Sequence, residues 1–207
     1  MFSMNYETII LELMGRVQIL EQKVKDLEGQ TEDFERLIEE DGFEEQNREM
    51  KITRSVARQH VMDKINRTYG YLDAQKGNRA KQADIILTIN SGENEGEELL
   101  GKFYYSKSFH DFPSGWHTLK DSDLEKEHIK FHIFTVSFEN KFYTFIFSTE
   151  ELKQYVLNKP KDSSGQYYFY FHVKDEGKKI IDDRDGERDV HTYYENWHLF
   201  GELIKNI

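Results

Sequence analysis

The first forty residues repeat apolar side chains with a period of seven. Such a heptad repeat predicts a coiled coil, and β-branched residues at one seam position with leucine at the other favour two parallel strands. We therefore predict that residues 1–40 form a dimerisation helix and that residues 41–50 form a hinge. The seam residues expected to carry the dimer contact are Ile10, Leu13, Val17, Leu20, Val24, Leu27 and Phe34.

Charges beside this seam agree with a parallel pair. Arg16 would face Glu21 of the second helix, and Lys23 would face Glu28, with opposite signs each time. Exposed pairs of this kind set orientation more than they add stability. The alternative is a single amphipathic helix that packs on its own domain.

Residues 51–207 have a different pattern, which predicts one aromatic-rich α+β domain. Of the 29 aromatic residues, 25 lie after residue 50, so the hydrophobic core is expected there. We expect a mixed or antiparallel sheet with flanking helices, because short alternating runs are interspersed with runs of helical period.

The expected elements follow from this periodicity and from capping residues. Thr53 or Ser55 would cap a first helix, Ser148 with Glu151 forms a capping box, and Asp189 would open a last helix. Glu139-Asn140 and Glu176-Gly177 would be hairpin turns. The expected helices are 52–67, 121–127, 148–158 and a last helix from 189, and the expected strands are 69–72, 84–89, 102–108, 131–138, 141–147, 167–173 and 179–182.

The segment from Phe109 to His117 is predicted to be a loop. It contains a proline, and Trp116 would be its buried plug. Its side chains His110, Asp111 and His117 could bind a metal, and the alternative is a packed loop without a ligand.

Composition narrows the function classes. The chain has 207 residues, with 28 Lys plus Arg against 39 Asp plus Glu, a net charge of −11 and no cysteine. The absence of cysteine excludes disulfides, thiolate metal sites and a cysteine nucleophile. No apolar run is long enough to span a membrane, and no leader-like pattern opens the chain, so we expect a cytoplasmic protein.

The negative total hides a basic stretch. Residues 48–81 carry 9 basic and 3 acidic side chains, whereas residues 1–47 carry 4 basic and 13 acidic ones. Clustered cations are what a phosphate backbone requires, although they could instead balance the acidic parts of the same chain. The residues expected to bind nucleic acid are Arg54, Arg58, Lys64, Arg67, Lys76, Arg79 and Lys81.

The expected order of elements from residue 52 to residue 138 is helix, three strands, helix, strand. Asp84 begins one of these strands, and Lys107 lies near the end of the next. This arrangement resembles the restriction-endonuclease-like core of the PD-(D/E)xK nucleases. The resemblance implies that Asp84 binds Mg²⁺ and that Lys107 stabilises developing charge, as catalytic residues of a phosphodiesterase.

The chain departs from that motif at one position. Tyr105 stands where the family has the acid of its acid-x-Lys pair, and tyrosine is a poor ligand for Mg²⁺ at neutral pH. Asp63, Glu98 or Gln75 could substitute as a ligand. The alternative is structural, with Asp84 capping a strand and Lys107 solvated.

The sequence thus favours a DNA-associated binding protein that is dimerised by its coiled coil and built on a degenerate nuclease-like core. We expect no membrane contact, and we favour a protein without enzyme activity; Mg²⁺ is the expected cofactor if the chain is a nuclease. The first alternative is an active Mg²⁺-dependent endonuclease with a relocated acid. The second is a protein-binding adaptor or inhibitor that does not contact nucleic acid.

Overall fold

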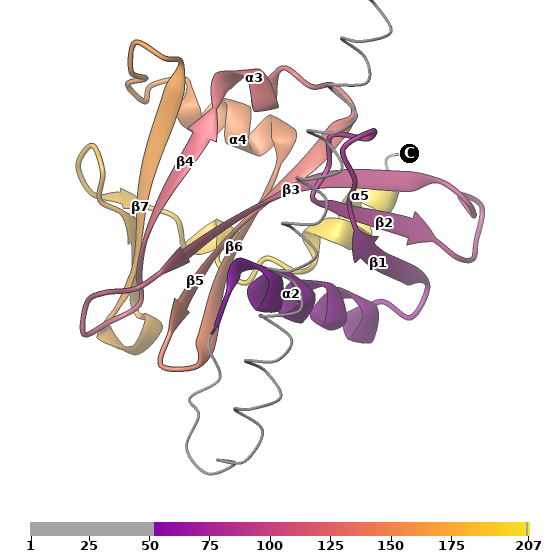
Figure 1. The fold of residues 1–207 in the computed structure, drawn as a ribbon, viewed down its shortest axis with the longest axis horizontal. Coiled ribbons are helices and arrows are strands. Elements are labelled where there is room, and N and C mark those ends of the chain that lie inside the picture. Colours follow the sequence, from indigo (N-terminus) through magenta and orange to yellow (C-terminus); the bar gives the residue numbers. More distant parts are fainter. Residues whose placement is uncertain (1–51, 206) are drawn as a thin grey trace, which may run out of the picture. The chain divides into compact units, whose positions relative to one another are not determined.

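The computed structural model describes residues 52–205 and residue 207 of the chain. They form an α+β domain with two β-sheets and few helices, as the sequence pattern predicts (Figure 1). The predicted coiled coil, its dimerisation residues and the hinge lie outside the described residues. None of the described helices is both long enough and apolar enough to cross a membrane.

The first sheet has five strands in the order β1-β2-β3-β5-β6. The strands β1, β2 and β3 pair antiparallel, β3 and β5 are parallel, and β6 returns antiparallel to β5. The mixed sheet that we expected is therefore confirmed. The strand bounds are β1 Leu72–Lys76, β2 Ile85–Ile89, β3 Glu98–Lys107, β5 Ile129–Phe138 and β6 Lys141–Ser148.

Helix α2 (Arg54–Thr68) packs on one side of this sheet. Thr53 caps it by accepting a hydrogen bond from the Val56 backbone N–H, at 3.3 Å. A buried stripe of Ala57, Val61 and Ile65 faces a core that also receives α5 (Leu199–Lys205). Burying that stripe stabilises the helix more than its intrinsic propensity does.

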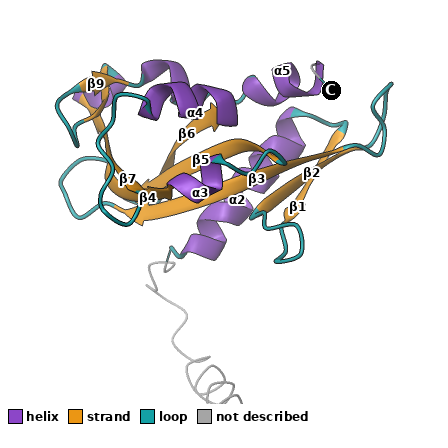
Figure 2. Ribbon diagram, turned by 90° about the horizontal axis from the view of Figure 1, so that it is seen from above, coloured by secondary structure: helices purple, strands orange, loops and turns teal. Residues whose placement is uncertain are grey.

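The second sheet has the order β4-β7-β8-β9 and shares a second core with the first. Strand β5 alternates between the two cores, because Ile133 lies in the first and Phe134 in the second. The helices α3 (Asp121–Leu124) and α4 (Thr149–Val156) contribute to the second core (Figure 2). The strands of the second sheet are β4 Ser114–Lys120, β7 Gln166–Lys174, β8 Lys179–Asp182 and β9 Arg188–Asp189.

The strongest local signals in the sequence are confirmed. Glu139 and Asn140 join β5 to β6 with φ values of 46° and 60°, the left-handed backbone that a tight hairpin requires. Ser148 and Glu151 form both hydrogen bonds of the capping box that opens α4.

Three boundaries differ from the prediction. The first strand begins at Leu72 rather than at residue 69, because a turn through Gly70 follows the helix. Strand β3 begins at Glu98, and α3 ends at Leu124. For β3 and α3 the local pattern identified the element but not its length, whereas the predicted first strand shares only Leu72 with β1.

The predicted helix from Asp189 is wrong. Asp189 does accept a hydrogen bond from the His191 N–H, but only a short 3₁₀ turn follows, and α5 begins at Leu199. Glu195 has a φ of 50° and exchanges hydrogen bonds with the backbone of Thr144 in β6. This contact with the sheet replaces helix formation.

The predicted loop at 109–117 is only partly a loop, since β4 begins at Ser114. The strand pairs with β7 along its whole length, and its side chains alternate between the two faces. His117 is therefore buried between the sheets, whereas Trp116 is 45% exposed on the outside and is not a plug.

Candidate functional site

Asp84 directly precedes β2, and its carboxylate is held by two neighbours. Oδ1 accepts a hydrogen bond from Arg54 Nη2 at 3.1 Å, and Oδ2 accepts one from the Phe103 backbone N–H at 3.2 Å. Arg54 also donates to the Phe103 carbonyl oxygen at 2.6 Å. The two side chains thus bind both backbone groups of Phe103.

The course of the sheet explains these contacts. Strand β2 pairs with β3 only between Glu98 and Gly101, although β3 continues to Lys107. Beyond that point no strand of the described part covers the β2 side of β3, and the Phe103 N–H and carbonyl need other partners. Asp84 and Arg54 supply them, which is the strand-capping role that the sequence left open.

Lys107 is not brought to Asp84. It pairs with Ser137 at the far end of β3, whereas Ile85 pairs with Gly101, so that the residue opposite Asp84 is Lys102. The ammonium group of Lys102 lies 3.5 Å from Asp123, which also pairs with Lys126 at 2.6 Å. The cation on the neighbouring strand is therefore held by Asp123 and not by Asp84.

The residues around Asp84 do not fit a magnesium ion. No group of three or more acidic or histidine side chains able to hold a metal occurs in the described part of the chain. The three possible substitutes are engaged elsewhere. Asp63 accepts from Gln59, Glu98 pairs with Lys81, and Gln75 donates to Asp73. Mg²⁺ requires several oxygen ligands, and these residues do not supply them around Asp84.

Asp84→Ala should lower the free energy of unfolding by about 1–3 kcal/mol, because the Phe103 N–H loses its acceptor. Millimolar MgCl₂ should leave the melting temperature of the full chain unchanged at constant ionic strength. Differential scanning fluorimetry measures both effects. A melting temperature that rises with Mg²⁺ and no longer rises in Asp84→Ala would contradict this assignment.

The seven cations predicted to bind nucleic acid fall into two groups. Because α2 runs antiparallel to β1, the beginning of the helix lies at the same end of the domain as Lys76, which closes β1. The connection from β1 to β2 continues there, since the Gly77 N–H donates to the Asp84 carbonyl at 2.9 Å. The cations at this basic end are Arg54 and Arg58 of α2, on the Ile85 face of the first sheet, and Lys76, Arg79 and Lys81, from a stretch whose Ala83 packs with Ile86 on the opposite face.

Lys64 and Arg67 belong to the second group, at the other end of α2. Lys64 binds Glu195 at 2.6 Å and lies over the ring of Trp197, 4.4 Å from its centroid. Arg67 lies nine residues after Arg58, which places the two on opposite sides of the helix at 100° per residue. The seven residues therefore do not form one surface.

Carboxylates engage some cations of the basic end but not all of them. Arg54 pairs with Asp84, and Lys81 pairs with Glu98. Arg58, Lys76 and Arg79 make no ion pair with a carboxylate of the described residues, and Lys76 and Arg79 are exposed. Five cations against two carboxylates leave the basic end positively charged.

A buried polar pair lies next to this site, on the inner face of the first sheet. The Tyr104 hydroxyl lies 3.3 Å from His132 Nδ1, and the two rings are stacked. Burial raises the pKa of Tyr104 well above its usual value and lowers the pKa of His132 to about 3. Both side chains are therefore neutral at physiological pH, and neither is poised for proton transfer near pH 7.

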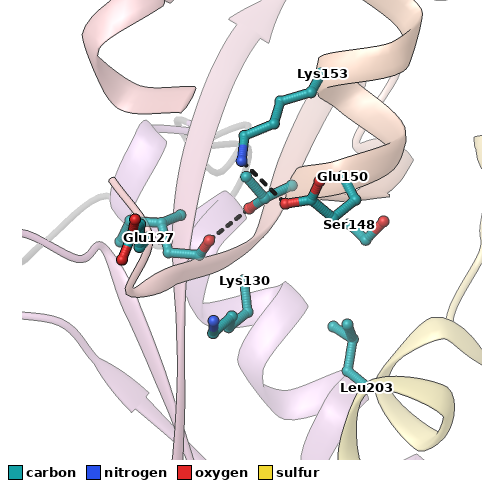
Figure 3. Close-up of a pocket in the computed structure, with 8 residues that line it drawn as sticks. Glu127, Lys130, Ser148, Glu150, Lys153 and Leu203 are labelled. Carbon is teal, nitrogen blue, oxygen red and sulfur yellow. Dashed lines mark hydrogen bonds and ion pairs between the residues drawn. The ribbon is translucent and has the colours of Figure 1, made fainter. Parts of the chain in front are cut away.

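A small pocket lies where α4 begins, between the start of β5 and α5 (Figure 3). Its volume is about 120 Å³, whereas ligand pockets typically have roughly 300–1,000 Å³. Lys153 faces into it but pairs with Glu150 at 2.9 Å, and Glu127 stands opposite Lys130 (Figure 3). These charges balance, so the pocket is not a phosphate site.

The metal suggested for the 109–117 segment is not supported by the geometry. His117 is buried between the sheets, whereas His110 lies outside and contacts the Tyr170 hydroxyl at 2.6 Å. The run from Tyr167 to Phe171 is apolar on both faces, a pattern that predicts cover on both sides. The structure has instead a partly exposed aromatic face there, formed by Trp116, Tyr168 and Tyr170. The signal was present in the alternation of Gly115, His117 and Leu119 with polar or exposed residues.

No family model matches this chain, and no curated protein matches it. Among solved structures, the bacterial homing endonuclease I-Ssp6803I is similar over 76% of this chain and 96% of its own, with 15% identity and a TM-score of 0.47. At these values the likeness is distant, and it carries no inference about binding or activity.

Proposed function

We propose that this chain is a DNA-binding protein built on a degenerate nuclease-like core, which binds the phosphate backbone at its basic end without cutting it. The order of helix, three antiparallel strands and parallel return agrees with such a core, with β4 as an addition within the crossover. The proposal includes dimerisation through residues 1–40, which would let two basic ends meet one duplex.

The observation that supports this proposal most directly is that cations from three elements lie at one end of the domain. Arg58 comes from α2, Lys76 from β1 and Arg79 from the connection between β1 and β2. None pairs with a described carboxylate, so each can bind a phosphate without first breaking an ion pair. The amides of Gln75 and Asn78 lie in the same stretch and are suitable partners for phosphate oxygens.

The lack of cleavage follows from the surroundings of Asp84. Its two carboxylate oxygens are bound by Arg54 and Phe103, and Lys102 stands opposite. A metal-dependent nuclease needs at least one more oxygen ligand at this place. Arg54 and the Phe103 N–H thus occupy the carboxylate oxygens that a metal ion would need.

Gel shifts of the full chain on duplex DNA test this proposal. The triple variant Arg58→Glu, Lys76→Glu, Arg79→Glu should weaken binding at low salt by at least about tenfold. It should also reduce the slope of log K against log salt by about 3, one for each lost phosphate contact. Arg54 is left unchanged because its loss would also uncap Phe103.

Arg67→Glu is the matched control, because it reverses one exposed charge on the same helix at the other end. It should reduce affinity far less than Arg58→Glu does. Equal effects of the two single variants would show that net charge alone matters, and the absence of any shift at low salt would contradict DNA binding. Plasmid cleavage with Mg²⁺ or Mn²⁺ that Asp84→Ala abolishes would instead establish the nuclease.

A further inference from the structure

The outer face of the second sheet carries three aromatic side chains in one cluster. Trp116 in β4 pairs directly with Tyr170 in β7, and its ring centroid lies 5.5 Å from that of Tyr168. Strands β4 and β7 run side by side over the length of this cluster (Figure 1). Trp116 is 45% exposed, and both tyrosines are half-buried.

This face differs from the other side of the same strands. Phe169 and Phe171 of β7 point into the second core and are fully buried. On the outer side, no element of the described residues covers Trp116. The nearby Phe109, in the connection from β3 to β4, is 90% exposed. Large aromatic side chains left exposed together mark a binding surface more often than single exposed ones do.

Arg184 lies over this cluster. Its guanidinium carbon is 4.9 Å from the centroid of the Trp116 ring and 5.7 Å from that of Tyr168. Its backbone N–H donates to Asp182 Oδ1 at 3.3 Å, which fixes the start of the side chain. Arg184 is exposed, and its guanidinium makes no ion pair with a carboxylate in the described part of the chain.

Three carboxylates near Arg184 are engaged by other groups. Asp162 accepts hydrogen bonds from the Tyr168 hydroxyl at 2.6 Å and from the Gln166 and Ser164 backbone. The buried Lys159 binds both Asp182 and Asp185. Asp183 lies beside the cluster, since its backbone N–H donates to the Tyr170 carbonyl at 2.9 Å, and its carboxylate makes no ion pair within the described residues. The guanidinium donors therefore remain free for an external anion.

Two further cations border the aromatic cluster. Lys120 ends β4 and Lys174 ends β7, at opposite ends of the face, because the two strands are antiparallel. Neither pairs with a carboxylate of the described residues. The ring of His110 contacts the Tyr170 hydroxyl at its edge. Aromatic rings flanked by unpaired cations complement a ligand that alternates flat apolar groups with negative charges.

We propose that this face binds single-stranded nucleic acid, with unpaired bases stacked on Trp116 and the two tyrosines and a phosphate on Arg184. A base offers a flat π-face, and each backbone phosphate offers a charge that the arginine fork can bind through two hydrogen bonds. A duplex hides its base faces, so the surface is distinct in ligand and location from the basic end.

Fluorescence anisotropy of a labelled thymidine oligomer of about 12 nucleotides tests this inference on the full chain. The oligomer should bind and quench the tryptophan fluorescence. Trp116→Ala and Tyr168→Ala should each weaken its binding by roughly 5- to 150-fold, the loss expected for one stacked base. Trp116→Phe keeps a smaller aromatic ring for stacking. Oligomer bound to this variant should no longer quench the tryptophan fluorescence.

Matched controls separate stacking from charge and from folding. Tyr71→Ala removes another exposed tyrosine, in the turn after α2, and should leave oligomer affinity unchanged. Inorganic polyphosphate of equal charge should bind wild type and Trp116→Ala equally. Circular dichroism of each variant verifies that the fold is intact.

The two proposals fail separately. The triple variant of the basic end should lose duplex binding, and Trp116→Ala should lose only single-strand binding. An oligomer that binds Trp116→Ala as tightly as wild type would overturn the inference. So would the absence of oligomer binding at low salt, or sedimentation showing that this face is instead covered by a second copy and that Trp116→Ala releases it.

Discussion

Asp182→Ala should lower the free energy of unfolding by about 3–5 kcal/mol, the cost of breaking a buried ion pair by removing one partner. The side chains of Asp182 and Lys159 are both fully buried, with 2.8 Å between the ammonium nitrogen and Oδ2. Tyr155 also donates to Oδ2 at 3.0 Å, and the Tyr170 N–H donates to Oδ1 at 2.8 Å. Removal of the carboxylate leaves the Tyr155 hydroxyl and the Tyr170 N–H without this acceptor, and leaves Lys159 with Asp185 alone.

Urea unfolding of the full chain measures this effect. Lys179→Met is the matched control, because it breaks the exposed pair with Glu187 on the adjacent hairpin and should cost less than about 1 kcal/mol. The double variant Lys159→Met, Asp182→Asn removes both charges and should be less destabilised than the sum of its single variants. Additive losses would show that the two groups are not coupled.

The second large effect is on pH dependence. Burial lowers the pKa of His117 and of His132 to about 3, from an ordinary value of 6.5. Between these two values the unfolded chain binds a proton at each histidine and the folded chain does not. Stability should therefore fall as the pH falls below about 6.5, by up to about 2.7 kcal/mol per pH unit for the two together.

His117→Leu isolates half of this effect. The ring of His117 packs between Phe134 and Phe171, and its Nε2 has no hydrogen-bond partner, so an apolar side chain suits the place. Urea unfolding between pH 7.5 and pH 5 gives the free energy of unfolding at each pH. Its slope against pH below about 6.5 should be smaller in His117→Leu than in wild type by about 1.4 kcal/mol per pH unit. The exposed His128→Leu should leave the slope as in wild type. An unchanged slope in His117→Leu would refute the assignment.

Local chemistry in the sequence was sufficient for the elements whose ends depend on neighbouring residues. Thr53, Ser148 with Glu151, and the Glu139-Asn140 turn all have the contacts expected of them. These features are set within four residues along the chain, so one sequence is enough to find them.

The site residues depended on register, which local patterns do not determine. The resemblance paired Asp84 with Lys107, but β3 begins at Glu98, and the hairpin sets Lys102 opposite Asp84. A strand that begins four residues earlier changes every cross-strand neighbour without changing the alternation of the later residues. Arg54 could not be assigned to Phe103 from the sequence, since they are 49 residues apart.

Strand β4 was missed because its glycine has a role other than turn formation. A Cβ atom on Gly115 would lie 2.3 Å from Val136 Cγ2, so the glycine allows β4 to approach β5 closely. Two residues after Pro113, a glycine is typical of a loop. The loop prediction made Trp116 a buried plug, so its exposure beside the tyrosines of β7 was not predicted.

The cap that Arg54 and Asp84 place on β3 also bears on how the protein behaves at high concentration. Beyond Gly101, the β2 side of β3 has no strand partner among the described residues, and a bare strand edge can pair with the same edge of another copy. The two side chains occupy the first backbone groups of that edge. Loss of Asp84 would thus appear first as concentration-dependent self-association, before any loss of helix or core packing.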